Sequence, residues 1–221
     1  MSNVTFMPLG GGPEIGANCY LFSADGHQIL LDSGIHPKKE GIGALPEFSL
    51  LKRAPDGVII SHGHVDHCGS LPYLLKPFPT VAGYTTKPTL QIIDRMLHNS
   101  VSVMSTLALE QGIREYPLYT HRDVDFAIRR TYGLGLQHEF ALTWECPFRV
   151  RFQHSGHVLG GATVLVRTPD HTLLYSGDIC VQDQELMRGL TPLEPDVEVD
   201  TLVIESTRGA HEEVERVVLE E

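Results

Sequence analysis

Short apolar runs recur along the chain, each bounded by glycine, proline or aspartate. Val, Ile, Leu and Thr dominate these runs, which is typical of strands that bury one or both faces. The predicted strands cover residues 3–8, 18–23, 27–32, 57–61, 79–82, 149–154, 161–168, 171–177 and 201–205. Between the second and third strands, Asp25-Gly26 predicts a hairpin turn.

Apolar residues at three- and four-residue steps predict helices between and after these strands. In residues 89–109 they form one stripe, made of Ile93, Leu97, Val101, Met104 and Ala108. Residues 121–132 follow Thr120, and Asp123 three positions later makes this a capping-box-like start. Residues 212–221 predict an acidic helix with one valine-rich side. Hairpins followed by alternating strands and helices predict an α/β fold with a mixed sheet covered by helices.

The composition is that of a folded protein rather than a disordered or fibrous one. Of 221 residues, 42% are hydrophobic and 20% are charged. The length suits one large domain or two small ones. No apolar run approaches the roughly 18 to 20 residues that span a bilayer, and the first residues do not resemble a secretory signal. We therefore expect no membrane partner and a cytoplasmic location.

The charge is distributed unevenly. The formal net charge is −11. Residues 1–169 hold 14 Lys/Arg and 14 Asp/Glu, whereas residues 170–221 hold 3 Lys/Arg and 14 Asp/Glu. A protein that binds nucleic acid needs a basic surface. Any nucleic-acid hypothesis therefore has to explain the acidic C-terminal part.

Cysteine and histidine usage differ in what they indicate. The four cysteines are far apart and form no C-x-x-C pair, which predicts isolated thiols in a reducing compartment. Histidine is the unusual residue type, because three of the twelve fall within six positions. Most of the others, including His27 and His154, lie outside recognisable motifs, and a structural or surface role is expected for them.

The clustered histidines directly follow the apolar run at 57–60, in the order His62, His64, Asp66 and His67. His62 and His64 are two residues apart, so in an extended segment they project to the same side. A glycine and a proline soon afterwards predict a turn into a short helix. Imidazole and carboxylate groups form the ligand set that zinc or manganese favours. The H-x-H-x-D-H spacing therefore predicts a metal site at the end of a strand.

This motif resembles the defining motif of the metallo-β-lactamase fold, and the other motifs of that fold occur in the expected order. Asp32 ends the sequence Leu30-Leu31-Asp32, His157 lies in Ser155-Gly156-His157, and Asp178 ends Ser176-Gly177-Asp178. The resemblance covers nearly the whole chain. It implies an αββα sandwich.

Two further segments resemble the β-CASP branch of that fold, the nucleases of RNA processing and DNA repair that include RNase J and the cleavage-and-polyadenylation endonucleases. Glu205-Ser206-Thr207 resembles the first extra motif of the branch, and the glycine-rich loop at 9–21 is similar as well. Glutamate in this motif resembles the RNA-directed members, whereas DNA-directed members more often carry aspartate. Arg208 departs from the pattern, because the RNA-directed members commonly have an aromatic residue there.

The resemblance implies two divalent metal ions, zinc or manganese, and these ligands: His62, His64, Asp66, His67, His157 and Asp178. His62, His64 and His157 would hold one ion, Asp66 and His67 would hold the other, and Asp178 would bridge them. Asp66, Asp178 and Glu205 are the implied catalytic residues, acting on a phosphodiester through a hydroxide activated by both metals. Asp32 would orient a ligand imidazole by accepting its N–H.

The β-CASP resemblance also sets the expected domain organisation and partners. Residues 1–207 would be the N-terminal part of the metallo-β-lactamase domain and 208–221 the start of the cap, with the remainder absent from this chain. The expected substrate is single-stranded RNA, or alternatively single-stranded DNA, contacted mainly through the cap, so residues 1–221 alone would be poorly active. A thioester or amide hydrolase of the same fold and an inactive scaffold subunit are two competing hypotheses. The sequence is compatible with an oligomer.

Overall fold

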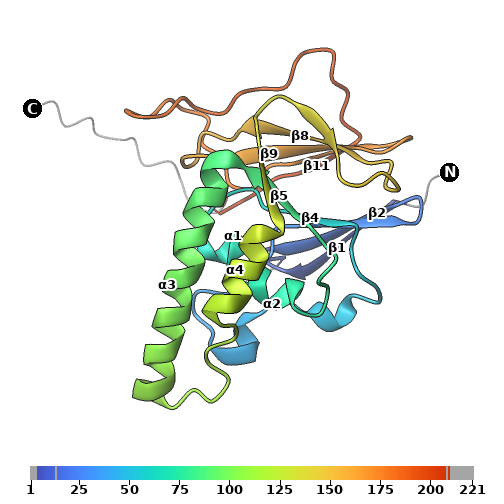
Figure 1. Ribbon diagram of the computed structural model, residues 1–221. Helices are drawn as coiled ribbons and strands as arrows, with labels where there is room; N and C mark the ends of the chain where they lie inside the picture. The colour runs from blue at the N-terminus through green and yellow to red at the C-terminus, as the bar shows by residue number, and fades with distance from the viewer. Residues whose placement is uncertain (1–3, 13, 208, 210–221) are drawn as a thin grey trace, which may run out of the picture.

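The computed structural model describes residues 4–12, 14–207 and 209. Two β-sheets lie face to face, and helices cover the outer face of one of them (Figure 1). The first sheet follows chain order: β1 (Thr5–Gly10), β2 (Cys19–Ala24), β3 (His27–Leu31), β4 (Gly57–Ile59), β5 (Gly83–Thr86) and β6 (Thr131–Leu134). Its first three strands are antiparallel, and β3 to β6 run parallel.

The second sheet has the order β11 (Thr201–Val203), β10 (Thr172–Tyr175), β9 (Ala162–Arg167), β8 (Arg149–His154) and β7 (Glu139–Ala141). All its neighbours are antiparallel except β10 and β11. The helices are α1 (Val65–Cys68), α2 (Leu71–Leu75), α3 (Lys87–Gln111) and α4 (His121–Arg129), with short 3₁₀ turns at Gly41–Ala44 and Phe48–Leu50. The α/β class and the two-sheet metallo-β-lactamase sandwich expected from the sequence are confirmed, with a helical layer on the first sheet. Within the described residues the outer face of the second sheet carries no helix, and Glu194 pairs there with Arg151.

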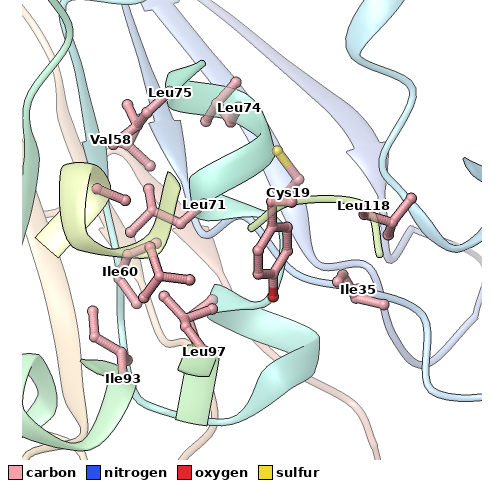
Figure 2. Packing of buried hydrophobic residues seen from close by; sticks show 14 of the residues in the cluster. Cys19, Ile35, Val58, Ile60, Leu71, Leu74, Leu75, Ile93, Leu97 and Leu118 are labelled. Atoms are coloured by element: carbon pink, nitrogen blue, oxygen red, sulfur yellow. The ribbon is translucent and has the colours of Figure 1, made fainter. Parts of the chain in front are cut away.

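The middle strands of the first sheet separate two apolar cores, because successive side chains of a strand point to opposite faces. On β3 and β4, Ile29, Leu31 and Ile59 pack against the second sheet. Leu30 and Val58 point the other way, into the core under the helices. Figure 2 shows this helix-side core, in which α2 and α3 contribute leucine and isoleucine side chains. These strands are apolar on both faces because both faces are covered.

Two local predictions are confirmed in detail. Asp25 and Gly26 connect β2 and β3 with φ of 51° and 81°, and positive φ at both positions is the type I′ hairpin geometry. At the start of α4, the Thr120 side chain accepts from the Asp123 N–H while the Asp123 carboxylate accepts from the Thr120 N–H. Both signals are local, so the sequence alone specifies them.

Other predicted boundaries are wrong. Residues 79–82 form a turn and an irregular segment, and the strand begins only at Gly83. Pro77 and Pro79 have no N–H to donate to a neighbouring strand, so pairing starts after them. The helix predicted over 121–132 ends at Arg129, because Thr131 onwards pairs with β5 as β6. The predicted helix at 212–221 lies outside the described residues.

The connection between β7 and β8 carries Trp144, the only tryptophan of the chain, whose side chain is 90% exposed. Two residues later, Cys146 is buried. None of the four cysteines is in a disulfide bond. Across the described part of the chain, no helix combines the length and the apolar character that a membrane crossing needs.

Candidate metal centre

The predicted ligands gather where the parallel strands β3 and β4 end. Asp32 directly follows β3 with a left-handed φ of 62°, a conformation that aspartate tolerates better than most residues. His62 follows β4, and His64 is the residue before the first turn of α1. His67 lies within α1, so the predicted short helix after the motif is confirmed.

Four ligand atoms converge on one point, from His62, His64, His157 and Asp178, and all lie within 4.8 Å of one another. His64 Nδ1 is 3.0 Å from His62 Nε2 and 3.3 Å from His157 Nε2. Asp178 Oδ2 is 3.5 Å from His157 Nε2 and 3.8 Å from His62 Nε2. Two ligand atoms bonded to one tetrahedral zinc ion at about 2.0–2.1 Å lie about 3.3 Å apart. The four side chains therefore fit a single cation.

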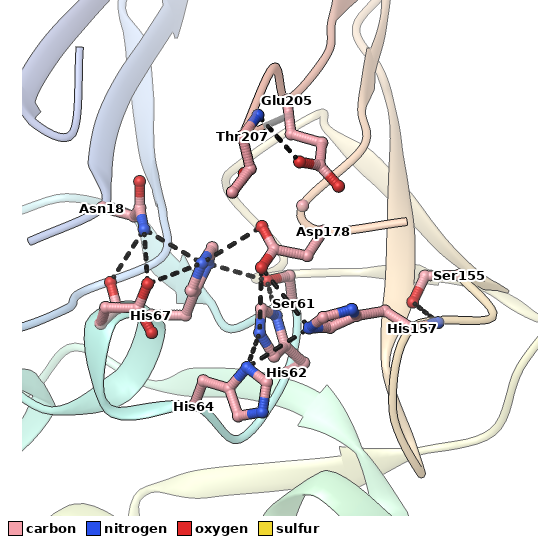
Figure 3. Close-up of polar contacts among 12 residues, drawn as sticks. Asn18, Ser61, His62, His64, His67, Ser155, His157, Asp178, Glu205 and Thr207 are labelled. Carbon is pink, nitrogen blue, oxygen red and sulfur yellow. Dashed lines mark hydrogen bonds and ion pairs between the residues drawn. The ribbon is translucent and has the colours of Figure 1, made fainter. Parts of the chain in front are cut away.

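The other two predicted ligands, Asp66 and His67, form an adjacent group. In Figure 3, His67 lies on the other side of Asp178 from His157. His67 Nε2 is 3.4 Å from Asp178 Oδ1 and 3.6 Å from Asp66 Oδ2. Asp178 thus directs one carboxylate oxygen at each group. A carboxylate in this position can be shared by two cations.

Asp32 lies behind this second group and is fully buried. Its Oδ1 accepts from the Ser61 N–H at 2.7 Å, and its Oδ2 accepts from the Ser61 and Tyr175 hydroxyls at 2.8 and 2.6 Å. His67 Nδ1 donates to the same Oδ2 at 2.7 Å. This contact places a proton on Nδ1 and turns Nε2 towards Asp66 and Asp178.

The two groups of ligands differ in the pKa values of their histidines. Burial, aided by the nearby His67 charge, lowers the pKa of His62 to about 2. Burial alone would also lower the pKa of His67, but Asp32 and Asp178 outweigh it and raise that pKa to about 10. Burial likewise opposes the charge of Asp178, yet the hydrogen bond from His67 and its charge lower the pKa of Asp178 to about 2. His62 therefore offers a free lone pair at neutral pH, whereas His67 must lose a proton to bind a cation.

The loop that carries His157 is tied to the start of α3. The Gly160 carbonyl accepts from the hydroxyls of Thr86 and Thr89 at 2.6 and 2.9 Å. Gly160 has a φ of 79°, and a Cβ there would lie 2.7 Å from the Thr89 nitrogen. Glycine is required at this close approach.

Glu205 lies beside the centre rather than in it. Its Oε1 accepts from the N–H of Ile179 at 2.9 Å, and its Oε2 accepts from the N–H of Thr207 at 3.2 Å. Among the described contacts, the Glu205 carboxylate makes no hydrogen bond to any of the six predicted ligands. Its contact with the Ile179 N–H holds the peptide bond between Asp178 and Ile179 in place.

Asn18 is a site residue to which the sequence motifs assign no individual role. Its Nδ2 lies 3.0 Å from His67 Nε2 and donates to the Asp66 carbonyl at 3.1 Å. The Tyr20 hydroxyl donates to Asn18 Oδ1 at 3.1 Å, which fixes the orientation of the amide. The only signal in the sequence was its place in the glycine-rich loop that resembles the β-CASP branch.

Comparisons with known proteins agree with this geometry. Residues 12–209 match the model of the Metallo-beta-lactamase superfamily. The chain is 35% identical over 210 residues to Cleavage and polyadenylation specificity factor 73 of Drosophila melanogaster, covering 92% of this chain and 28% of that protein. It is 31% identical to Endoribonuclease YSH1 of Gibberella zeae, covering 98% and 25%. It is 30% identical to an RNase J-like protein of Methanocaldococcus jannaschii, covering 96% and 46%.

Solved structures share the fold at lower identity. An Enterococcus faecalis protein of unknown function superposes with a TM-score of 0.56 at 20% identity, covering 82% of this chain and 44% of that one. A mutant metallo-beta-lactamase of Cronobacter sakazakii superposes with a TM-score of 0.52 at 15% identity, covering 81% and 62%. The chain spans less than half the length of the three curated relatives named above. The expected resemblance to the β-CASP branch is confirmed. The chain therefore belongs to the metallo-beta-lactamase superfamily.

Proposed function

We propose that this chain is the metal-binding part of a ribonuclease that hydrolyses phosphodiester bonds in single-stranded RNA. The observation that carries the proposal is the position of Asp178, whose two oxygens face two separate groups of histidine and aspartate ligands. Relatives that are named endoribonucleases support RNA as the substrate. The proposal includes zinc or manganese as the cations and a cytoplasmic location.

The residues present fit two divalent cations. His62, His64 and His157 with Asp178 Oδ2 would hold one, and Asp66 and His67 with Asp178 Oδ1 would hold the other. Imidazole and carboxylate donors suit zinc and manganese. Such ions, when bound, would acidify a water molecule and neutralise charge on phosphoryl oxygens.

Two carboxylates of the protein, those of Asp32 and Glu205, hold the ligand side chains in position. Asp32 keeps the Nδ1 proton on His67, so that Nε2 faces Asp66 and Asp178. The Glu205 carboxylate accepts a hydrogen bond from the Ile179 N–H and thereby holds the Asp178 backbone in place. We assign Glu205 to this positioning task within the catalytic machinery, in place of the direct catalytic role expected from the sequence.

The acidic net charge is compatible with this function at the site itself. Two divalent cations bring four positive charges to a centre whose nearby aspartates are Asp32, Asp66 and Asp178. A phosphate is then attracted locally although the chain as a whole is acidic. Because the chain spans less than half of each of these curated relatives, the proposal assigns to residues 1–207 only the metal centre and the scissile phosphate.

The test is cleavage of end-labelled single-stranded RNA, single-stranded DNA and a thioester by this chain, each with Mn²⁺ or Zn²⁺. The matched variant is Asp178→Asn, which preserves shape but bridges two cations poorly. We expect slow, metal-dependent cleavage of RNA that falls at least tenfold in the variant, equivalent to about 1.4 kcal/mol of barrier. Equal cleavage rates for the two proteins would show that Asp178 is not a ligand shared by two cations. Preference for DNA or for the thioester would replace the proposed substrate, and no metal-dependent cleavage of any of the three would contradict the proposal.

A further inference from the structure

A second cluster of potential ligands lies at the other end of the strands that carry the metal centre. His27 begins β3, Asp56 precedes β4, and Cys146 precedes β8. One ligand atom from each lies within 4.8 Å of the other two. His27 and Asp32 are separated by the length of β3, about 16 Å in an extended strand. This group, the hairpin cluster, is thus distinct from the metal centre.

We propose that the hairpin cluster binds a zinc ion through three protein ligands, which leaves the fourth position of the ion open to water. His27 Nδ1 and Asp56 Oδ2 are 3.4 Å apart, close to the spacing of about 3.3 Å expected for two ligands of one tetrahedral zinc ion. This distance is long for a hydrogen bond between them. At 3.4 Å the two atoms form an ion pair when the imidazole is charged, and the same spacing admits a cation bound to both of them.

An unsatisfied atom supports the same conclusion. His27 Nδ1 is buried and has no hydrogen-bond partner among the described residues. The imidazole packs edge-on against Phe148, with ring centroids 5.9 Å apart, which limits its rotation. A buried nitrogen without a partner carries a desolvation cost of about 1–3 kcal/mol, and a bound cation would remove it.

The other two ligands are held in place by backbone contacts. Asp56 Oδ2 accepts from the Gln28 N–H at 2.8 Å, as ligating carboxylates commonly do. The Cys146 N–H donates to Thr143 Oγ1 at 3.0 Å, and the Cys146 thiol is buried and free of any disulfide bond. These contacts hold one oxygen of Asp56 and the backbone of Cys146 in place before a metal arrives.

The chemistry of the donors selects zinc. Thiolate, imidazole and carboxylate groups are the donors that zinc combines in proteins, whereas calcium and magnesium require oxygen ligands. One thiolate and one carboxylate balance the two charges of the ion. Arg53 is the competing cation, but its Nη1 is 3.9 Å from Asp56 Oδ2 and its side chain is 47% exposed. A zinc ion here would join the β2–β3 hairpin of the first sheet to the segment that leads into β8 of the second.

Cobalt substitution tests the proposal, because a thiolate bound to Co²⁺ gives an ultraviolet charge-transfer band. The metal centre contributes no such band, since its gathered ligands are histidine and aspartate only. We expect the band in the unaltered chain, and its loss together with one equivalent of bound metal in Cys146→Ser. The matched control is Cys180→Ser, which replaces the partly exposed cysteine near Asp178 and should keep the band.

A second variant covers the case in which Cys146→Ser does not fold, as judged by circular dichroism. His27→Gln keeps the thiol and removes the imidazole, so the band should then appear only at metal concentrations at least tenfold higher. A band that persists in Cys146→Ser, disappears in Cys180→Ser or is absent from the unaltered chain would overturn the proposal. An unchanged titration in His27→Gln would do the same. None of these outcomes depends on nuclease activity, so they leave the proposed function to its own test.

Discussion

Asp32 shows how a single residue can be buried with its charge. Its two oxygens receive four hydrogen bonds, from the Ser61 backbone, the Ser61 and Tyr175 hydroxyls and the His67 ring. Burying a carboxylate without such partners is prohibitively costly. The saturated carboxylate in turn fixes the tautomer and the direction of one ligand imidazole. Asp32 therefore links the interior of the protein to the metal centre.

The raised pKa of His67 predicts how the metal-free protein responds to pH. The folded protein holds this proton up to about pH 10, whereas the unfolded chain releases it near the ordinary value of 6.5. The stabilisation is therefore complete below pH 6.5 and is lost as the pH rises towards 10. The lowered pKa of His62 acts in the other direction and at acid pH, because its stabilisation is lost as the pH falls below 6.5.

Denaturant unfolding in the presence of a chelator measures this effect. Between pH 6.5 and 10, we expect the free energy of unfolding to fall more steeply for the unaltered chain than for His67→Gln. Parallel pH profiles for the two proteins would show that the imidazolium is not formed in the folded state.

Asn18 gives a second prediction at this scale. Asn18→Asp removes the amide N–H that the Asp66 carbonyl accepts. The new carboxylate is repelled by Asp66 and attracted by the protonated His67 ring, so these two effects offset each other and the lost hydrogen bond determines the change in stability. In the metal-free protein we expect a loss of about 1–3 kcal/mol of stability. Added Zn²⁺ or Mn²⁺ should recover much of it, because a nearby cation attracts the new charge.

The matched control is Asn99→Asp, which makes the same replacement at an exposed position of α3. Thermal unfolding with chelator and with metal compares the two variants. The role assigned to Asn18 is wrong if its variant responds to metal no more than the control does.

Among the secondary-structure elements, α3 supports the metal centre from outside. Thr86 caps this helix by accepting from the Thr89 N–H, and its hydroxyl also donates to Gly160 in the loop that carries His157. One side chain thus joins the start of the helix to a ligand loop distant in sequence.

Thr86→Val should therefore weaken both the helix and the loop. We expect a loss of about 0.5–2 kcal/mol in stability, the range for a removed N-cap, together with weaker metal binding through His157. Thr106→Val is the matched control, since Thr106 lies on the exposed face of the same helix. Chemical denaturation and metal titration measure the two effects. Unchanged metal affinity in Thr86→Val would show that the loop keeps its position without this contact.

The elements that the sequence predicted well are those with local or strongly periodic signals. The β8 bounds and the capping box at Thr120 are confirmed, because neither requires knowledge of distant residues. β6 and β7 were missed, since each is short and becomes a strand only by pairing with a neighbour. Element ends thus depend on partners that a single sequence does not reveal.

The same distinction applies to the site. Motif order identified six side chains that the structure brings together or places side by side. Asn18 and Tyr175 received no role, because their contacts join residues 48 and 143 positions apart. The hairpin cluster was not anticipated either, as His27 and Cys146 each lack a motif. Spacing reveals ligands that are close in sequence or belong to a known pattern, but not ligands assembled by folding alone.

For the molecule as a whole, charge limits how it meets its substrate. The net charge of −11 arises from residues 170–221, while the rest of the chain is balanced. Affinity for nucleic acid depends on lysine and arginine side chains that displace counterions from phosphates. This chain offers few of them in clusters, so under the proposed function the cations held by the metal centre would be its main attraction for RNA.

We therefore predict that the affinity of this chain for single-stranded RNA is weak and only slightly dependent on salt. Between about 50 and 200 mM salt, a protein with many phosphate contacts loses 10³–10⁵ in affinity, and we expect less than about tenfold here. Fluorescence anisotropy of labelled RNA with the unaltered, metal-loaded chain, read before the slow cleavage expected above proceeds, measures the slope. A thousandfold loss would indicate a basic surface that the sequence does not suggest.

The exposed position of Trp144 has a practical consequence for spectroscopy. Because the only indole is already 90% in water, its emission should change little when the two apolar cores come apart. It lies two residues from Cys146, however, and therefore reports on the segment that leads into β8. Fluorescence of this protein is thus a local indicator for the hairpin cluster, and a paramagnetic ion such as Co²⁺ bound there should quench it while the fold stays intact.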